Sequence, residues 1–435
     1  QAEQRSLLEK QMSVATERYL AYLNRLKTEL GNTAQAGERI TQVKSAEGFQ
    51  DTLRELGAGT VALYTIIGEN KYSVMLITPN AQVAGDYPIS REELHKKVFA
   101  LNALLKSPTS NLPALQTQAA ELYKILLGPI EKNLDGAQAK TLMWSLDGAL
   151  RYLPMSVLFD AKSKQYLIER YRTVLYTPAG ASDLKNPPRA SWQGVGFGVS
   201  KAISNAAVGT FSALRSVPDE LKSVIRTREN KTGVIEGAMY LDEQFTEDQL
   251  RGVLRSRRYP LIHIASHFAF KPGDGLKSFL LLGNGKALTL DEIRKTQNLF
   301  SGVDLLALSA CETGVGEKDE EGREVEGFGA LAQNKGAKAV LATLWPVADE
   351  STAKFMSEFY RLRETKGWNK AEALRQAQIT LLRGQFPITP QPNVSAQDRT
   401  STLVGATQST PQREASKLYA HPYYWAPFIF IGNWQ

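Results

Sequence analysis

LIHIASH at residues 261–267 and DLLALSACETG at residues 304–314 decide the fold of this chain. Each stretch is a short apolar run that leads into a side chain able to do chemistry, His267 in the first and Cys311 in the second. In an open α/β sheet the carboxyl ends of parallel strands meet at one edge, where the loops converge. If the two strands are neighbours, His267 and Cys311 lie at the same edge.

The second half of the chain repeats this pattern of short apolar runs that alternate with helical periodicity. Such alternation predicts a mostly parallel sheet with helices on both faces. The expected strands are 194–199, 261–265, 279–282, 303–308 and 339–344, with a last buried strand at 423–431, and the expected helices are 219–228, 247–255, 325–335, 350–363 and 370–382.

The first half is more mixed. β-Branched and aromatic runs at 61–67 and 72–78 predict a hairpin, and helical periodicity follows at 91–105 and 115–127. The runs at 141–146 and 166–176 are strand-like. Before them, the apolar spacing from Leu8 to Leu30 is typical of an amphipathic helix, and 32–59 is a weaker helix with a linker. Near the end, residues 387–415 have the polar, proline-containing composition of a mobile insertion.

Composition narrows the class of protein. The 435 residues hold one cysteine, four histidines and a formal net charge of +7. One cysteine closes no intramolecular disulfide, and no Cys/His cluster has zinc-ligand spacing, so we expect no structural metal and no cofactor. No apolar run is long enough to span a membrane, which favours a soluble, cytoplasmic protein. The mild, scattered positive charge does not indicate direct nucleic-acid binding.

A thiol beside an imidazole is the minimum machinery for covalent cysteine catalysis. A lone cysteine is more often simply buried, but its place at a strand end, downstream of a similarly placed histidine, favours a nucleophile. His263, four residues before His267, is expected to be a packed strand histidine, because no third ligand has suitable spacing. His421 is expected to be structural, and Trp345 and Trp425 to be core.

Several segments in this order resemble the CHAT domain, a caspase-like peptidase domain often attached to tetratricopeptide repeats. The resemblance covers roughly residues 60–434. It is carried by HIASHF at 263–268, LSACETG at 308–314, EGFGALAQNKGAKAVLATLWPVAD at 326–349, FYRL at 359–362, AEALRQAQ at 371–378 and HPYYWAPFIFIG at 421–432, with FTEDQLRGVL at 245–254 and LPMSVLFD at 153–160.

The resemblance implies a caspase-like three-layer α/β/α fold with a helical segment at 1–57, a degenerate lobe at 58–188 and a catalytic lobe at 189–435. By the same analogy, residues 1–57 are the end of an upstream helical repeat array. Because the chain opens on Gln, we expect it to be a fragment or a processed form.

The resemblance also assigns a Cys311–His267 dyad with no metal, in which Cys311 is the nucleophile and His267 the general acid. The backbone N–H groups of Phe268 and Cys311 would form the oxyanion hole. One position departs from the pattern, since relatives usually have Gly where this chain has Phe268. The donor survives only if Phe adopts the backbone angles required.

The expected function is therefore a cysteine endopeptidase that cleaves a partner protein, held in check by an upstream or partner module that acts through the N-terminal helical region. The acidic stretch after Cys311 is first of all a solvated loop. Alternatively, Glu312, Glu324 or Asp349 faces the cleft and binds a basic substrate residue. Two rival functions stay open: a dormant docking module in a bacterial defence or signalling complex, and an acyltransferase that uses the same dyad.

Overall fold

The computed structural model describes residues 49–186, 191–205, 208–270, 278–309, 311–313, 323–347, 349–385 and 419–435. For residues 270, 311–313, 323–327 and 349–350 it describes the backbone alone. The amphipathic helix expected at 8–30 and the insertion expected at 387–415 lie outside the described residues.

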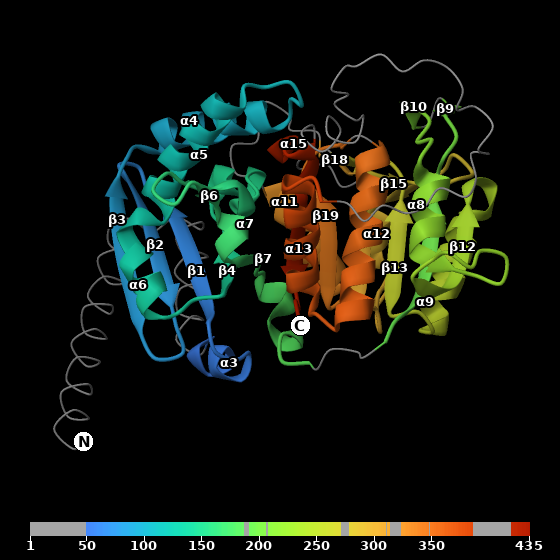
Figure 1. Ribbon diagram of the computed structural model, residues 1–435. Coiled ribbons are helices and arrows are strands. Elements are labelled where there is room, and N and C mark those ends of the chain that lie inside the picture. The colour runs from blue at the N-terminus through green and yellow to red at the C-terminus, as the bar shows by residue number, and fades with distance from the viewer. Residues whose placement is uncertain are drawn as a thin grey trace, which may run out of the picture.

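A single continuous sheet of twelve strands runs through the described part of the chain (Figure 1). Its order is β11 (Ile225–Arg226), β12 (Ile235–Leu241), β8 (Gln193–Gly198), β13 (Leu261–Ala265), β17 (Leu305–Leu308), β19 (Ala339–Thr343), β20 (Phe428–Gly432), β7 (Arg172–Leu175), β4 (Thr141–Ser145), β1 (Thr60–Ile67), β2 (Lys71–Ile77) and β3 (Gln82–Pro88).

The strands from β11 to β19 are mutually parallel, and so are β7, β4 and β1. The last strand of the chain, β20, lies between these two groups, antiparallel to β19 and parallel to β7. The hairpin expected at 61–78 is confirmed as β1 and β2, and β3 extends it at the edge of the sheet. The C-terminal strand β20 therefore joins the strands that the first half contributes to this sheet, within β1 to β7, and those of the second half, within β8 to β19.

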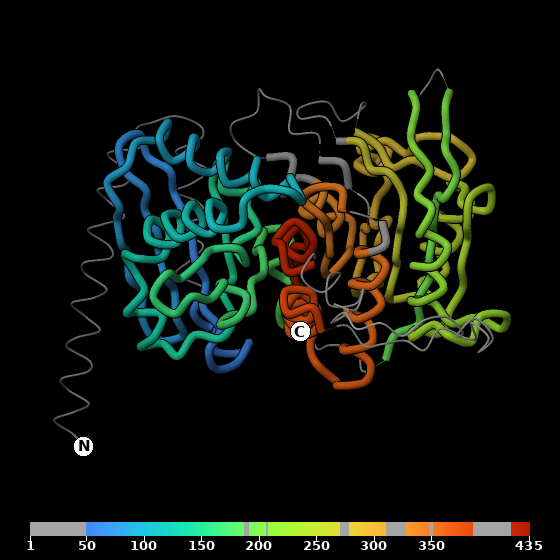
Figure 2. Tube along the Cα trace, turned by 45° about the horizontal axis from the view of Figure 1, so that its top comes forward, coloured from blue at the N-terminus to red at the C-terminus, as the bar shows by residue number. Residues whose placement is uncertain are grey.

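Smaller sheets lie beside the main one. Four short strands form the sheet that carries the candidate site: β16 (Ala287–Thr289), β15 (Phe279–Leu281), β14 (Phe268–Phe270) and β18 (Cys311–Thr313). A hairpin of β9 (Ile203–Asn205) and β10 (Gly209–Phe211) projects from the second half (Figure 2), and β5 (Phe159–Asp160) pairs with β6 (Gln165–Tyr166).

The helices are α3 (Phe49–Glu55), α4 (Arg91–Leu105), α5 (Leu112–Leu126), α6 (Glu131–Gly136), α7 (Leu167–Arg170), α8 (Val217–Val224), α9 (Glu247–Ser256), α10 (Leu290–Lys295), α11 (Arg323–Asn334), α12 (Asp349–Lys366), α13 (Lys370–Leu382) and α15 (Pro422–Trp425). None of these has the length and apolar character needed to cross a bilayer.

Alternate residues of β20 face the helices on opposite sides of the sheet. The Phe428 ring stacks on Phe355 of α12 at 3.6 Å between centroids. On the other side, a Cβ added at Gly329 of α11 would lie 2.5 Å from Cδ1 of Ile431, so helix and strand are in close contact. The expected three-layer α/β/α class is confirmed.

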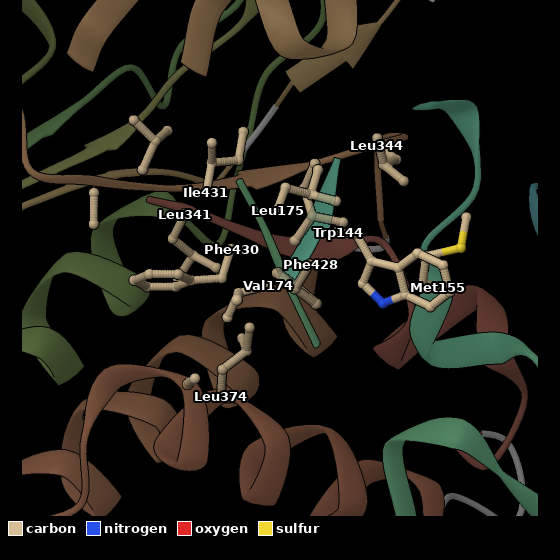
Figure 3. Close-up of a cluster of buried hydrophobic side chains, with 14 of the residues drawn as sticks. Trp144, Met155, Val174, Leu175, Leu341, Leu344, Leu374, Phe428, Phe430 and Ile431 are labelled. Carbon is tan, nitrogen blue, oxygen red and sulfur yellow. The ribbon is translucent and has the colours of Figure 1, made fainter. Parts of the chain in front are cut away.

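Side chains from both halves share one hydrophobic core where β20 meets β7 (Figure 3). Trp144, Val174 and Leu175 of the first half are buried together with Leu341, Phe430 and other residues of the second. Because burial of apolar area is the main stabilising term, the two halves stabilise each other.

Some expected boundaries are wrong. The single strand expected at 166–176 is interrupted by α7, whose start is stabilised because the Glu169 carboxylate accepts a bond from the Tyr166 N–H at 3.0 Å. The strand expected at 423–431 begins as the short helix α15. The run at 279–282 forms β15 of the four-stranded sheet, not a strand of the main one.

Candidate active site

The two strands that lead to His267 and Cys311 are neighbours, as expected. β13 and β17 pair in parallel, with His263 opposite Ala307, and the N–H of Ser309 donates to the carbonyl of Ile264 at 3.0 Å. Both segments then leave the main sheet and pair again in parallel as β14 and β18. The second pairing sets Phe268 directly opposite Cys311. The backbone therefore places His267 one residue from the position that faces the cysteine.

His267 is buried, with 4% of its surface exposed. Its Nε2 lies 2.8 Å from the carbonyl oxygen of Ser212, which accepts, so Nε2 carries a proton. The Phe211 ring lies 5.0 Å from the imidazole between centroids, and Phe279 meets Phe211 edge-on. A backbone carbonyl and an aromatic ring therefore fix the tautomer and the orientation of this histidine.

Phe268 occupies ordinary extended backbone in β14. It is absent from the described non-glycine residues with positive φ, so its phenyl ring causes no conformational strain there. The ring is buried and meets Phe328 of α11 edge-on at 4.8 Å. On the β15 side, the N–H of Leu281 donates to the carbonyl of His267 at 2.9 Å. Since backbone groups alternate along a strand, the N–H of Phe268 points toward β18.

The carboxylates expected at the cleft are placed by their backbone only. Glu312 is the middle residue of β18, opposite Ala269. Glu324 is the second residue of α11, and Asp349 is the first residue of α12. Glu312 therefore lies on the strand that contains Cys311, Glu324 on the next helix, and Asp349 on the helix that follows β19.

The other histidines of the second half have structural environments, as expected. His263 is fully buried, with Nε2 2.8 Å from Oε1 of Glu220 and Nδ1 3.0 Å from the Tyr360 hydroxyl. Burial and the nearby Glu220 carboxylate raise the pKa of Tyr360 well above its usual value. His421 accepts a bond from the N–H of Tyr423 and so caps α15, while burial lowers its pKa.

Trp345 and Trp425 are buried core residues, as the sequence predicts. Among the residues that the structure describes, no group of three or more His, Cys, Asp or Glu side chains is arranged to hold a metal ion. The chemistry that the described geometry brings together at this edge is that of an oriented imidazole next to the Cys311 strand.

Sequence reasoning missed the residues that orient His267. Ser212 acts through its backbone carbonyl, which every residue type has, so its identity carries no signal. The hairpin that precedes Ser212 does carry a signal in the sequence, because it contains Asn205 and Gly209, and Gly209 has a positive φ of 92°. Asn205 and glycine are typical turn residues.

A family model described as CHAT domain matches residues 116–433. This chain belongs to the CHAT domain family. The match begins inside the first half and ends at the last strand, so both halves contribute to the domain.

Two curated relatives of this CHAT domain are Tetratricopeptide repeat protein 28 of Homo sapiens, 22% identical over 379 residues, and its Mus musculus counterpart, 23% identical over 406 residues. The alignments cover 75% and 78% of this chain but only 14% and 15% of the relatives. The chain therefore spans about one seventh of those proteins.

Among solved structures, the separase–securin complex of Saccharomyces cerevisiae is similar to this CHAT domain with a TM-score of 0.52 at 11% identity. The similarity covers 93% of this chain and 32% of the other. At this identity the comparison concerns the fold, and it agrees with the caspase-like architecture that the sequence resemblance implies.

Proposed function

We propose that this CHAT domain is a cysteine endopeptidase in which Cys311 and His267 form the catalytic dyad. The observation that carries the proposal is the register of β14 and β18, which sets Phe268 opposite Cys311, so that the buried His267 directly precedes the residue paired with the cysteine. A thiol and an imidazole carried by neighbouring backbone segments would need little reorganisation before proton transfer.

In the proposed reaction Nδ1 of His267 takes the proton of the Cys311 thiol, and the thiolate attacks the carbonyl carbon of the scissile peptide bond. The carbon–nitrogen bond breaks as His267 gives a proton to the leaving amine, and an acyl thioester remains on the sulfur. Water then attacks the thioester, which releases a carboxylate and regenerates the thiol. Donation from Nε2 of His267 to Ser212 keeps the ring in one orientation through both half-reactions.

The N–H groups of Phe268 and Cys311 are the proposed oxyanion donors. The extended backbone of Phe268, without positive φ, supports this role only in that a phenylalanine fits the position without strain. A free thiol as nucleophile also fits a reducing compartment such as the cytoplasm.

For the substrate we propose a partner protein with a basic residue before the cut. The proposed contacts are the carboxylates of Glu312, Glu324 and Asp349, which follow the strand ends at the site edge. For regulation we propose an upstream or partner module that acts through residues 1–57. The curated relatives are named for tetratricopeptide repeats, and the similar solved structure is of a complex between two proteins, which supports a protein partner.

An irreversible peptidyl electrophile with a basic residue next to the warhead tests the proposal. Wild-type protein should be labelled once per chain, on Cys311. Labelling should be abolished in Cys311→Ala and slowed at least about 100-fold in His267→Ala, since general acid–base catalysis contributes about 10²–10⁴-fold. Equal labelling of wild type and His267→Ala would contradict the dyad.

The alternative is a dormant docking module in a bacterial defence or signalling complex. The observation that favours it is the Phe268 ring, buried against Phe328 at a position where relatives usually have Gly. A protein that binds its partner with the same affinity in wild type and Cys311→Ala, and that never reacts with the electrophile, would have this function. Product mass spectrometry separates hydrolysis, which leaves a free carboxylate, from acyl transfer.

A further inference from the structure

The carbonyl that orients His267 belongs to an exposed segment. Ser212 follows β10 of the projecting hairpin, and Ser204, Asn205, Gly209 and Thr210 of that hairpin are exposed, as is Ser212 itself. Figure 2 shows the hairpin standing clear of the second half. Burial therefore does not fix the position of this carbonyl, and something else must.

The hairpin is part of a loop from Ser200 to Leu214, and a backbone hydrogen bond between these two residues closes the loop. The N–H of Leu214, two residues after Ser212, donates to the carbonyl of Ser200 at 3.1 Å. Ser200 follows the end of β8, where the N–H of Val199 donates to the carbonyl of Ala265 at 3.0 Å. The residues that begin this loop are thus hydrogen-bonded to the end of β13, the strand that leads to His267.

Asp242 holds Ser200 in place. Its Oδ1 accepts from the N–H of Ser200 at 2.7 Å and from the N–H of Lys201 at 3.3 Å, and its Oδ2 accepts from the Ser200 hydroxyl at 2.8 Å. Asp242 is buried, with 7% of its surface exposed, directly after β12. Three donors on one carboxylate make a specific clamp, because charge-assisted hydrogen bonds are short and strong.

The backbone of Asp242 is unusual in a way that fits this role. It has a positive φ of 50°, a conformation that Asp and Asn tolerate better than most residues. A Cβ added at Gly283 would lie 1.7 Å from the Asp242 carbonyl oxygen, so the chain after β15 runs directly against it. β15 in turn pairs with β14, the strand that begins next to His267. Asp242 is therefore held between Ser200, which its side chain binds, and the chain after β15, which packs against its backbone.

We propose that Asp242 is a positioning residue for His267. It acts through Ser200 and Leu214, which hold the Ser212 carbonyl where it accepts the Nε2 proton. This inference rests on the proposed function for its catalytic consequence, but its structural content, one tautomer and one ring position of His267, does not depend on catalysis.

Three substitutions distinguish the effect of losing the Asp242 hydrogen bonds from the effect of changing its backbone conformation. Asp242→Gly accepts the positive φ but has no acceptor, whereas Asp242→Asn tolerates the conformation and keeps one side-chain oxygen. Ser200→Ala removes one donor only. The matched control is Glu243→Ala, which removes the neighbouring carboxylate, paired with Lys201 at 2.6 Å on the exposed surface.

The first readout is turnover of a peptide substrate per active site titrated with the electrophile. Asp242→Gly should lower kcat about 10- to 100-fold with KM within about twofold, because a misplacement of about 1 Å can cost that much. Ser200→Ala should be intermediate, and Asp242→Asn and Glu243→Ala close to wild type. Wild-type kcat in folded Asp242→Gly would overturn the inference.

The second readout needs no activity. With ¹⁵N-labelled histidine the four imidazoles are few enough to assign, and His267→Gln identifies the resonances of the site. Wild type should show the Nε2-protonated tautomer of His267, and Asp242→Gly a mixture of tautomers. An inactive wild type that still shows this change would refute the proposed function and support the clamp. An unchanged tautomer in Asp242→Gly would refute the clamp, whatever the activity.

Discussion

Phe268 lies opposite Cys311 in the parallel register of β14 and β18, and its ring is buried against Phe328. The residue that directly follows His267 is thus part of the core. Because the backbone there is extended and without positive φ, the aromatic side chain is compatible with the site and also packs against α11.

Phe268→Gly should therefore destabilise the protein. Removing a buried phenyl ring costs about 3–5 kcal/mol, and the added backbone freedom of Gly increases the loss. Urea denaturation at pH 7 measures the free energy of unfolding. Phe268→Leu should lose much less, since it keeps most of the buried volume. A Gly variant as stable as wild type and labelled faster at Cys311 would show that the ring obstructs the site.

The side-chain amide of Gln333, near the end of α11, fastens this helix to the first half. Its Oε1 accepts from the Thr177 hydroxyl at 2.5 Å. Cβ atoms added at Gly180 and Gly432 would lie 2.0 and 2.2 Å from its Nε2, so glycines of two segments enclose the amide. The helix that carries Phe328 is thus joined to the segment after β7.

Gly180→Ala and Gln333→Ala should each destabilise the protein, the first by a clash and the second by leaving the Thr177 hydroxyl without its acceptor, at about 1–3 kcal/mol. The double variant should cost less than the sum of the two, because Gln333→Ala removes the atoms that the new methyl group meets. Strictly additive free energies of unfolding would contradict the enclosure of the amide.

Protonation of His421 should destabilise the protein. Burial lowers the pKa of His421 below its usual 6.5. The unfolded chain therefore binds more protons than the folded one once the pH falls below about 6.5, so the free energy of unfolding falls as the pH falls. Nδ1 accepts the cap bond from Tyr423, and a proton there abolishes it.

His421→Asn keeps a cap acceptor but cannot titrate, so its unfolding free energy should depend less on pH between about 5.5 and 7.5 than that of wild type. Urea denaturation at several pH values gives the comparison. Identical slopes for the two proteins would mean that His421 makes no contribution to the pH dependence.

The sequence predicts the sheet well where strands are buried on both faces. β13 and β17 are uninterrupted apolar runs, and their neighbourhood follows from the rules of parallel sheets. β3 and β12 were missed for physical reasons. β3 is an edge strand with Gly85 and Pro88, and β12 contains Gly237, where the backbone of Gly194 approaches so closely that a Cβ would lie 1.7 Å from its oxygen.

The approach of the two candidate segments is predictable from the sequence, because His267 and Cys311 each follow a buried apolar strand and the two strands are neighbours. The orientation of His267 is not predictable, because it depends on a backbone carbonyl and on the Asp242 clamp, which joins residues far apart in the sequence. Asp242 looks in the sequence like one of several acidic residues before α9.

A buried ion pair lies at the amino ends of β13 and β17 in the main sheet, whereas the site lies at their carboxyl ends. Nζ of Lys370 is 3.4 Å from both carboxylate oxygens of Asp304, which precedes β17, and each residue is 1% exposed. The indole N–H of Trp192 donates to the same carboxylate at 2.9 Å. Burial, opposed by the Asp304 charge, lowers the pKa of Lys370 to about 8.

Lys370→Met should cost about 3–5 kcal/mol in free energy of unfolding, because it leaves the Asp304 charge buried without its partner. Adding Asp304→Asn removes that charge and keeps an acceptor for Trp192, so the double variant should be more stable than Lys370→Met alone. Between about pH 8 and 10.5 the unfolded chain binds the lysine proton more than the folded one, so wild-type stability should rise with pH, and this rise should be absent in Lys370→Met. Labelling of Cys311 in folded protein should not change, since the pair lies at the amino ends of the strands. A double variant less stable than Lys370→Met would show that the two charges are not coupled as the distances indicate.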